Sequence, residues 1–241
     1  MSLVAYLSPQ NLYNFCNRYW FATAIISFLL ISGNLFWIFV QVPIDFQQGV
    51  VAKIMYIHVP SAVLSMGLFA AMGVLGAIYL IYKIKVAPMI IRAIIPVGLL
   101  ITILVLLTGS IWGKPTWGTW WIWDARLTSE LILAFLYFAI HIYDKAMPNH
   151  QNTDNVLSVI AIIGSIDLPI IHYSVQWWHT LHQGPSILAF KAPTIAWPML
   201  WPLLLMILAI GCANGALIML RCKSIIITQE AKARWVRDLS K

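Results

Sequence analysis

Hydrophobic residues in this chain gather in six long runs, which short polar stretches separate. Each run is close to the roughly 20 residues that a helix needs to cross a bilayer. Backbone amides and carbonyls in lipid must pair within their own segment, so these runs predict helices rather than strands. The fourth and fifth runs are the least apolar, because Glu130 and Asp167 fall inside them. The predicted spans cover about 20–40, 59–82, 93–112, 127–143, 156–173 and 198–220.

The composition supports the same class of fold. The 241 residues are 61% hydrophobic and only 10% charged, whereas soluble domains carry about 25% charged residues. We therefore expect an all-α integral membrane protein, with residues 1–241 forming one domain in the absence of a linker or repeat. The net charge is +7, but the basic residues lie near helix ends rather than on one face. This scatter argues against nucleic-acid binding.

Basic residues favour one orientation of the six helices. With both termini in the cytoplasm, eleven of the 15 Lys and Arg residues lie on the cytoplasmic side. The tail 221–241 supplies six of them. The four outside are Lys53, Lys114, Arg126 and Lys191. The external loops are then 41–58, 113–126 and 174–197, and the chemically interesting stretches converge on that face.

One external stretch is unusually rich in tryptophan. The segment 113–130, GKPTWGTWWIWDARLTSE, holds Trp117, Trp120, Trp121 and Trp123 and continues into Asp124. An aromatic belt at the membrane boundary is one interpretation. A helical loop would instead place Trp117, Trp121 and Asp124 on one face. Trp120 and Trp123 would then form a second face. Such an interfacial platform is favoured, because ring faces stack on large, flat, apolar ligands.

Histidines flank this segment on both sides in sequence. His58 lies in YIHVPS at the start of the second span, and His182 lies in HYSVQWWHTLHQGPS after the fifth. Neutral imidazole is a common axial ligand of haem iron. A lone histidine at an interface is an ordinary hydrogen-bonding residue, and His172 and His179 compete with His182 for the second ligand position. Two histidines expected to be solvated on the cytoplasmic side are His141 and His150.

Charged residues complete the external set. Lys114, Arg126 and Lys191 are positioned to pair with the carboxylate tails of a ligand, or to neutralise Asp124 and Glu130. Carboxylates inside lipid are costly and are either paired structurally or functional, and these alternatives stay open for Glu130 and Asp167. The stretch GSIWGKPT lacks the spacing and the Ser or Thr of a phosphate loop, so ATP-derived energy would come from another subunit.

The stretch WGKPTWGTWWIWDARLTSE resembles the WWD signature of haem-handling proteins in cytochrome c biogenesis. With YIHVPSAVLSMG and LPIIHYSVQWWHTLHQG, the chain is similar over nearly its whole length to the CcmC family of the system I maturation pathway. The resemblance implies b-type haem in transit, bound by His58 and His182 as axial ligands to the iron. It places the WWD platform on Trp117, Trp120, Trp121, Trp123, Asp124 and Arg126, with Lys114 beside it.

The resemblance also implies partners and a location. The family works in the bacterial inner membrane with its active face toward the periplasm, where it promotes covalent attachment of haem to the chaperone CcmE. It acts with the small subunit CcmD, the ATPase complex of CcmA and CcmB, and membrane lipid. Competing hypotheses are a haem lyase of the CcsA or CcmF type, a b-type cytochrome, and the haem exporter subunit of an ABC transporter complex. No residue is expected to be catalytic in the strict sense.

Overall fold

Long helices form almost all of the structure, a computed structural model that describes residues 8–147, 151–178 and 195–239. No strand occurs in these ranges. Six helical stretches within them are long and apolar enough to cross a membrane, which confirms an all-α, multi-pass membrane fold. The elements are α2 (Pro9–Val40), the short η1 (Val50–Ile54), α3 (Met55–Tyr82), α4 (Val86–Trp117), α5 (Ala125–Ala146), α6 (Gln151–Gly164), α7 (Asp167–Trp177), α8 (Trp197–Gln229) and α9 (Arg234–Asp238).

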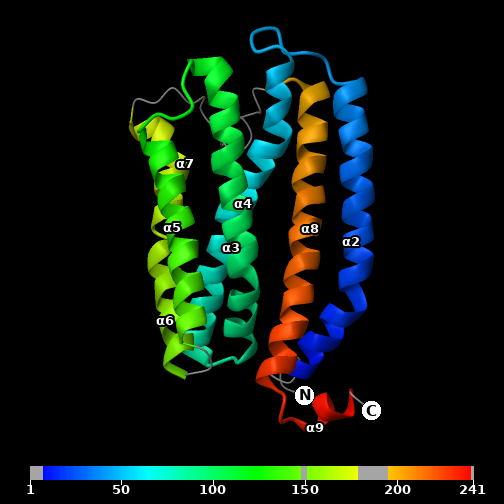
Figure 1. The fold of residues 1–241 in the computed structure, drawn as a ribbon, viewed down its shortest axis with the longest axis vertical. Coiled ribbons are helices and arrows are strands. Elements are labelled where there is room, and N and C mark those ends of the chain that lie inside the picture. The colour runs from blue at the N-terminus through cyan, green and yellow to red at the C-terminus, as the bar shows by residue number, and fades with distance from the viewer. Residues whose placement is uncertain (1–7, 148–150, 179–194, 240–241) are drawn as a thin grey trace.

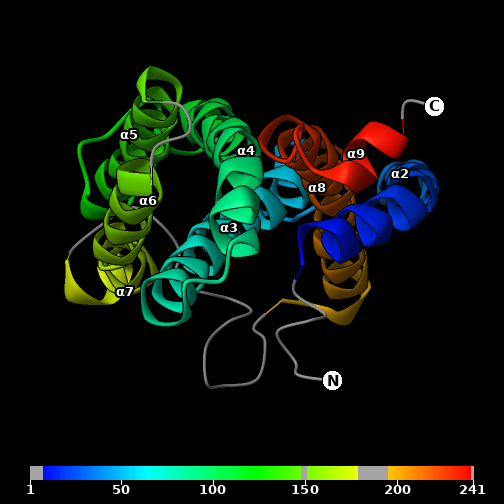
Figure 2. The ribbon, with the colours of Figure 1, turned by 90° about the horizontal axis from the view of Figure 1, so that it is seen from below.

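The helices α3 and α4 lie in the middle of the molecule (Figure 2). On one side α5 packs against α4 and α6 packs against α3, with α7 packing on α5. On the other side α8 packs against both, with α2 packing on α8. One apolar core joins α3, α4, α5 and α6 around Phe69, Leu133 and Tyr137. A second core joins α2, α3 and α8 around Ile38 and Leu203. The central pair therefore fixes how the two sides of the molecule are placed.

The two ends of the bundle differ in what they carry (Figure 1). At one end α3 begins, α4 ends, α5 begins, α7 ends and α8 begins. We call it the tryptophan end, because it carries residues 117–125. The opposite end holds the start of α2, the end of α8 and α9, so the N- and C-terminal helices meet there.

Several helices extend beyond the predicted spans. The first begins at Pro9 rather than near residue 20, because Ser8 caps it by accepting a hydrogen bond from Asn11 N at 3.2 Å. The last continues to Gln229 instead of stopping near residue 220, and the tail that follows forms α9. The polar first and last turns of these helices carry no hydropathy signal, which explains the shorter predicted ranges.

The fifth span consists of two helices rather than the single one expected over 156–173. The chain leaves the regular α pattern at Ser165, whose amide donates to the carbonyls of both Ala161 and Ile162 at 3.2 Å. Asp167 then begins α7. A carboxylate at the first residue of a helix lies near the positive end of the helix dipole. The break between α6 and α7 therefore places Asp167 at the first residue of a new helix within the fifth span.

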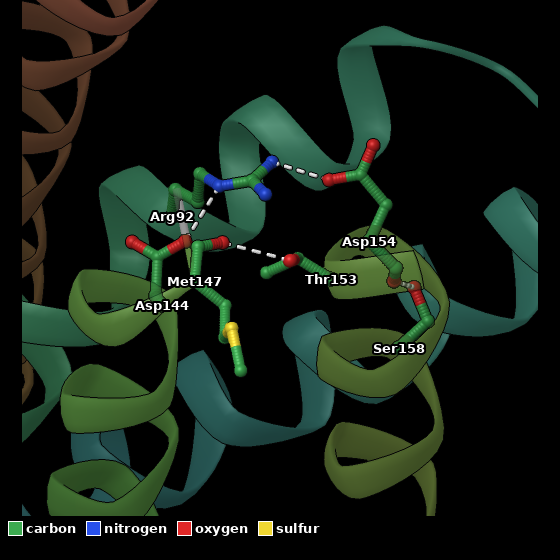
Figure 3. Close-up of polar contacts among 6 residues, drawn as sticks. All are labelled: Arg92, Asp144, Met147, Thr153, Asp154 and Ser158. Carbon is green, nitrogen blue, oxygen red and sulfur yellow. Dashed lines mark hydrogen bonds and ion pairs between the residues drawn. The ribbon is translucent and has the colours of Figure 1, made fainter. Parts of the chain in front are cut away.

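An ion-pair network joins three helices at the opposite end (Figure 3). Arg92 on α4 is buried, with its Nε 2.6 Å from Asp144 Oδ1 on α5 and its Nη1 2.6 Å from Asp154 Oδ1 on α6. The Thr153 hydroxyl donates to the Met147 carbonyl at 2.7 Å, across the break between α5 and α6. Removing one member of such a network leaves an uncompensated charge. Arg92 is therefore a structural link as well as a topology signal.

Candidate functional site

The tryptophan-rich segment is divided between two helices and a short connection. α4 continues through Trp117 and stops at Gly118, whose φ of +79° is left-handed and suits glycine. Lys114 Nζ donates to the Gly118 carbonyl at 3.0 Å and so helps to close the helix end. Residues 118–124 are not helical, and α5 restarts at Ala125. A helical platform through Trp117, Trp121 and Asp124 is therefore wrong, because the glycine ends the helix.

The indole rings of the connection differ in exposure. Trp120 is 58% exposed and Trp123 is 76% exposed, whereas Trp121 is half-buried. The rings of Trp121 and Trp123 meet edge to face, with centroids 5.5 Å apart. The Trp121 Nε1 is buried and has no hydrogen-bond partner among the described residues. The connection thus presents two open rings, of which Trp123 meets a partly covered ring whose N–H group has no partner within the described residues.

Asp124 has a defined structural role at the start of α5. Its side chain accepts a hydrogen bond from Leu127 N at 2.8 Å, and its backbone is extended. This geometry is an N-cap, which satisfies one of the free amides of the first turn. Arg126 follows in that turn, and its charge interacts with Asp124 and with Glu130 one turn further along α5. Helix capping therefore explains part of the order of charges at the start of α5.

His58 lies in the first turn of α3 and faces α4. Its Nδ1 is 3.0 Å from Thr108 Oγ1, and its ring meets Trp112 edge to face at 5.8 Å. The approach of the two helices is close, since a Cβ added at Gly109 would lie 3.0 Å from His58 Cε1. The imidazole is half-buried and held between two turns of α4.

The Thr108 hydroxyl determines which nitrogen of His58 carries the proton. This hydroxyl donates to the Leu104 carbonyl at 2.7 Å, so its one hydrogen is already used. With that bond made, the hydroxyl acts as an acceptor toward His58, which assigns the proton of the neutral ring to Nδ1. The lone pair of the neutral ring is then on Nε2, the form in which imidazole binds a metal through that atom.

Two residues near this site, Thr108 and Gln48, were not predicted from the sequence. Gln48 Oε1 accepts a hydrogen bond from Trp112 Nε1 at 2.8 Å and ties the loop before η1 to α4. The sequence signal for these two residues was that each is a polar residue inside or next to an apolar run. Their partners lie 50 and 64 residues away in the chain, so the pairing depends on helix register that no local pattern gives.

Below the first turn of α3 lies a buried polar cluster of Ser65, Glu130 and Tyr137, and Asp167 is close enough to interact with Glu130. Ser65 Oγ donates to Glu130 Oε1 at 3.1 Å, and Tyr137 donates to the Ser65 carbonyl at 2.9 Å. Glu130 therefore has a structural partner on a neighbouring helix. Asp167 Oδ2 and Ser61 Oγ are buried without a hydrogen-bond partner in the described part of the chain.

The remaining predicted ligands fall largely beyond the described ranges. His172 lies on α7, with its ring edge-on to Tyr173 at 4.7 Å. His141 lies near the end of α5 and is half-buried rather than fully solvated. The predicted residues that lie outside the described residues are His150, His179, His182 and Lys191. The structure thus brings His58, the tryptophan connection and His172 to the same end of the bundle, and the pairing with His182 stays a prediction.

Comparisons with known proteins show the family to which this sequence is similar. The sequence profile of the CcmC family, described as "Heme exporter protein C", matches residues 2–237. Proteins of that description are 40% identical over 235 residues in Haemophilus influenzae (98% of this chain and 96% of the relative) and 39% identical over 234 residues in Escherichia coli (96% and 93%). Another, in Rhodobacter capsulatus, is 33% identical over 241 residues and covers 99% of each chain. This chain belongs to the CcmC family.

Proposed function

We propose that this protein holds haem at the tryptophan end of its helix bundle and promotes its covalent transfer to a periplasmic chaperone of the CcmE type. The observation that carries the proposal is the setting of His58, whose Nδ1 is engaged by Thr108 beside the tryptophan-bearing end of α4. The family relatives are named for heme export, which supports a haem-handling role in cytochrome c maturation.

The chemistry of the described residues fits haem as the cargo. Haem is a flat apolar macrocycle with two carboxylate tails and an iron that takes axial imidazoles. Trp120 and Trp123 offer exposed ring faces, and the N–H group of Trp121, which has no partner in the part of the chain that the structure describes, offers a donor. Lys114 and Arg126 supply positive charge for carboxylates. Each chemical feature of the cargo has a matching group at this end.

His58 Nε2 is the proposed first axial ligand. A second-sphere acceptor such as Thr108 fixes the tautomer and the ring orientation of a ligating histidine. His182 is the proposed second ligand on the basis of the family resemblance. His172 on α7 is the alternative within the described residues.

Transfer would consist mainly of positioning. A carrier must shield the haem faces while leaving the vinyl edge open for a chaperone histidine, and holding both groups together replaces a random encounter with a near-attack geometry. The exposed Trp120 and Trp123 would form the open side of such a site. In the proposed orientation this end faces the periplasm across the bacterial inner membrane, with CcmD and the CcmA–CcmB ATPase as partners.

The test is a comparison of His58→Ala with His141→Ala in cells that also make a CcmE-type chaperone. Two readouts are needed: the absorption spectrum of the purified protein and the amount of haem covalently bound to the chaperone. His58→Ala should change the axial ligation of the bound haem and abolish chaperone loading. His141→Ala, at the opposite end of α5, should change neither. Wild-type spectrum and loading in His58→Ala would overturn the assignment and direct attention to His172.

A further inference from the structure

A large cavity lies at the opposite end of the bundle from the tryptophans. Its volume is about 860 Å³, within the range of about 300–1,000 Å³ typical of ligand sites. The walls come from the last turn of α3, the start of α4, the start of α6 and the turn after α8. Met89 and Tyr79 provide apolar surface, whereas the rim is strongly charged.

The charges that line this cavity are mainly positive. The basic members are Lys83, Lys85, Arg92 and Lys232, and the acidic ones are Asp154 and Glu230. Their net charge is +2, or +1 when Asp144, the other partner of Arg92, is included. Arg92 is fully used by its two aspartate partners (Figure 3). Lys83 donates to Asn155 Oδ1 at 3.1 Å and lies over the Tyr79 ring. The ammonium groups of Lys85 and Lys232 make no hydrogen bond or ion pair with the described residues, so they are available to an anion.

The start of α4 forms part of the same wall through Lys85 and Met89. Lys85 occupies the N-cap position without a side-chain cap, and the first turn, Val86 to Met89, is buried. A helix N-terminus carries a partial positive charge and presents amide groups that favour anions. A buried helix start usually has a capping partner. At α4, however, Ala87 N already donates to the Ile84 carbonyl at 3.1 Å and Pro88 has no N–H group, so the lysines are the groups of the cavity that an anion would bind.

We propose that this cavity binds the phosphate-bearing headgroup of an anionic membrane phospholipid. Its position at the end of the membrane-spanning helices is the level at which headgroups lie, and basic pockets between such helices recognise them. The last turn of α3 also exposes Ile81 and Tyr82 strongly, which provides an apolar outer surface for acyl chains next to Lys83. A soluble phosphate would bind the same lysines, but it has no acyl chain to contact the apolar surface.

The experiment measures the lipid bound to the full-length protein in nanodiscs that contain phosphatidylcholine with a small fraction of phosphatidylglycerol. The test variant is the double substitution Lys85→Gln, Lys232→Gln. The matched control is Lys145→Gln, Arg234→Gln, which removes the same charge from exposed positions at the same end but outside the cavity wall. A second arm adds inorganic phosphate as competitor.

The wild type should enrich phosphatidylglycerol over phosphatidylcholine, and the test variant should lose at least about tenfold in this preference, because two cations near the headgroup are removed. The control should keep it. Equal enrichment in the test and control variants would overturn the proposal. Full displacement by inorganic phosphate would also overturn it, since the ligand would then be a free anion. Haem binding is expected to be unchanged in all variants, so the result is independent of the proposed function.

Discussion

At the residue scale, the central feature is a hydrogen bond that orients one histidine. Residue type and position at a helix end were sufficient to predict His58 from the sequence as a candidate ligand. Thr108 could not be predicted as its partner, because the contact joins two helices whose relative register comes from tertiary packing. The structure adds that the Thr108 hydrogen is used by the Leu104 carbonyl, which leaves Nδ1–H as the donor.

We expect Thr108→Val to weaken haem binding about 10–100-fold, the usual cost of removing a second-sphere partner of a metal ligand. The reason is that His58 would lose the acceptor that fixes its tautomer. The measurement is a haem titration of the purified protein followed by absorption. Thr102→Val is the matched control, since Thr102 makes the same bond to the carbonyl four residues earlier, also at 2.7 Å, without contacting a histidine. Equal losses in the two variants would show that the effect comes from α4 and not from His58.

At the element scale, the tryptophan connection is defined by a helix stop and a helix start. Gly118 in the left-handed region ends α4, and Asp124 caps α5. Both signals are visible in the sequence, although the density of tryptophans suggested a helical face instead. The six spans themselves were predictable because a bilayer imposes a minimum apolar length. Their ends were not, since capped polar turns such as Ser8–Pro9 extend a helix without raising hydropathy.

The capping role predicts different outcomes for two substitutions of Asp124. Asp124→Ala should lower stability by about 1 kcal/mol, because the cap is lost, and should reduce chaperone loading by loosening the connection. Asp124→Asn keeps an efficient cap without the charge. Its stability and its chaperone loading should both stay close to those of the wild type. The measurements are the thermal unfolding midpoint in detergent and the fraction of chaperone that carries haem.

Ser8→Ala serves as the control for these variants, because it removes the cap of α2 far from the tryptophans. It should lower stability and leave loading intact. An Asp124→Asn protein as poor in loading as Asp124→Ala would contradict the capping account and show that the carboxylate charge itself is required.

At the scale of the whole molecule, the bundle separates two kinds of surface. The tryptophan end carries exposed indoles and His58, whereas the opposite end carries the Arg92 network and the basic cavity. The membrane orientation that the basic residues predict stays a prediction. The pairing of Arg92 with Asp144 and Asp154 could not be predicted, because it depends on α5 and α6 meeting α4 at the same end (Figure 3). The central helices α3 and α4 connect the two ends.

The most direct test of the account asks whether the tryptophan connection recognises haem or only anchors the protein. The double variant Trp120→Ala, Trp123→Ala is compared with Trp197→Ala, Trp201→Ala. The second pair is a matched control, being stacked, 65% and 56% exposed, and located at the start of α8 at the same end. Bound haem and haem-loaded chaperone are measured in the same membranes.

We predict that the first variant inserts normally but loses chaperone loading, since each stacking ring contributes about 1–3 kcal/mol in comparable aromatic contacts. The α8 variant should load the chaperone as the wild type does. Normal loading by the Trp120→Ala, Trp123→Ala protein, or an equal loss in both variants, would contradict the central claim and reduce the connection to an aromatic belt.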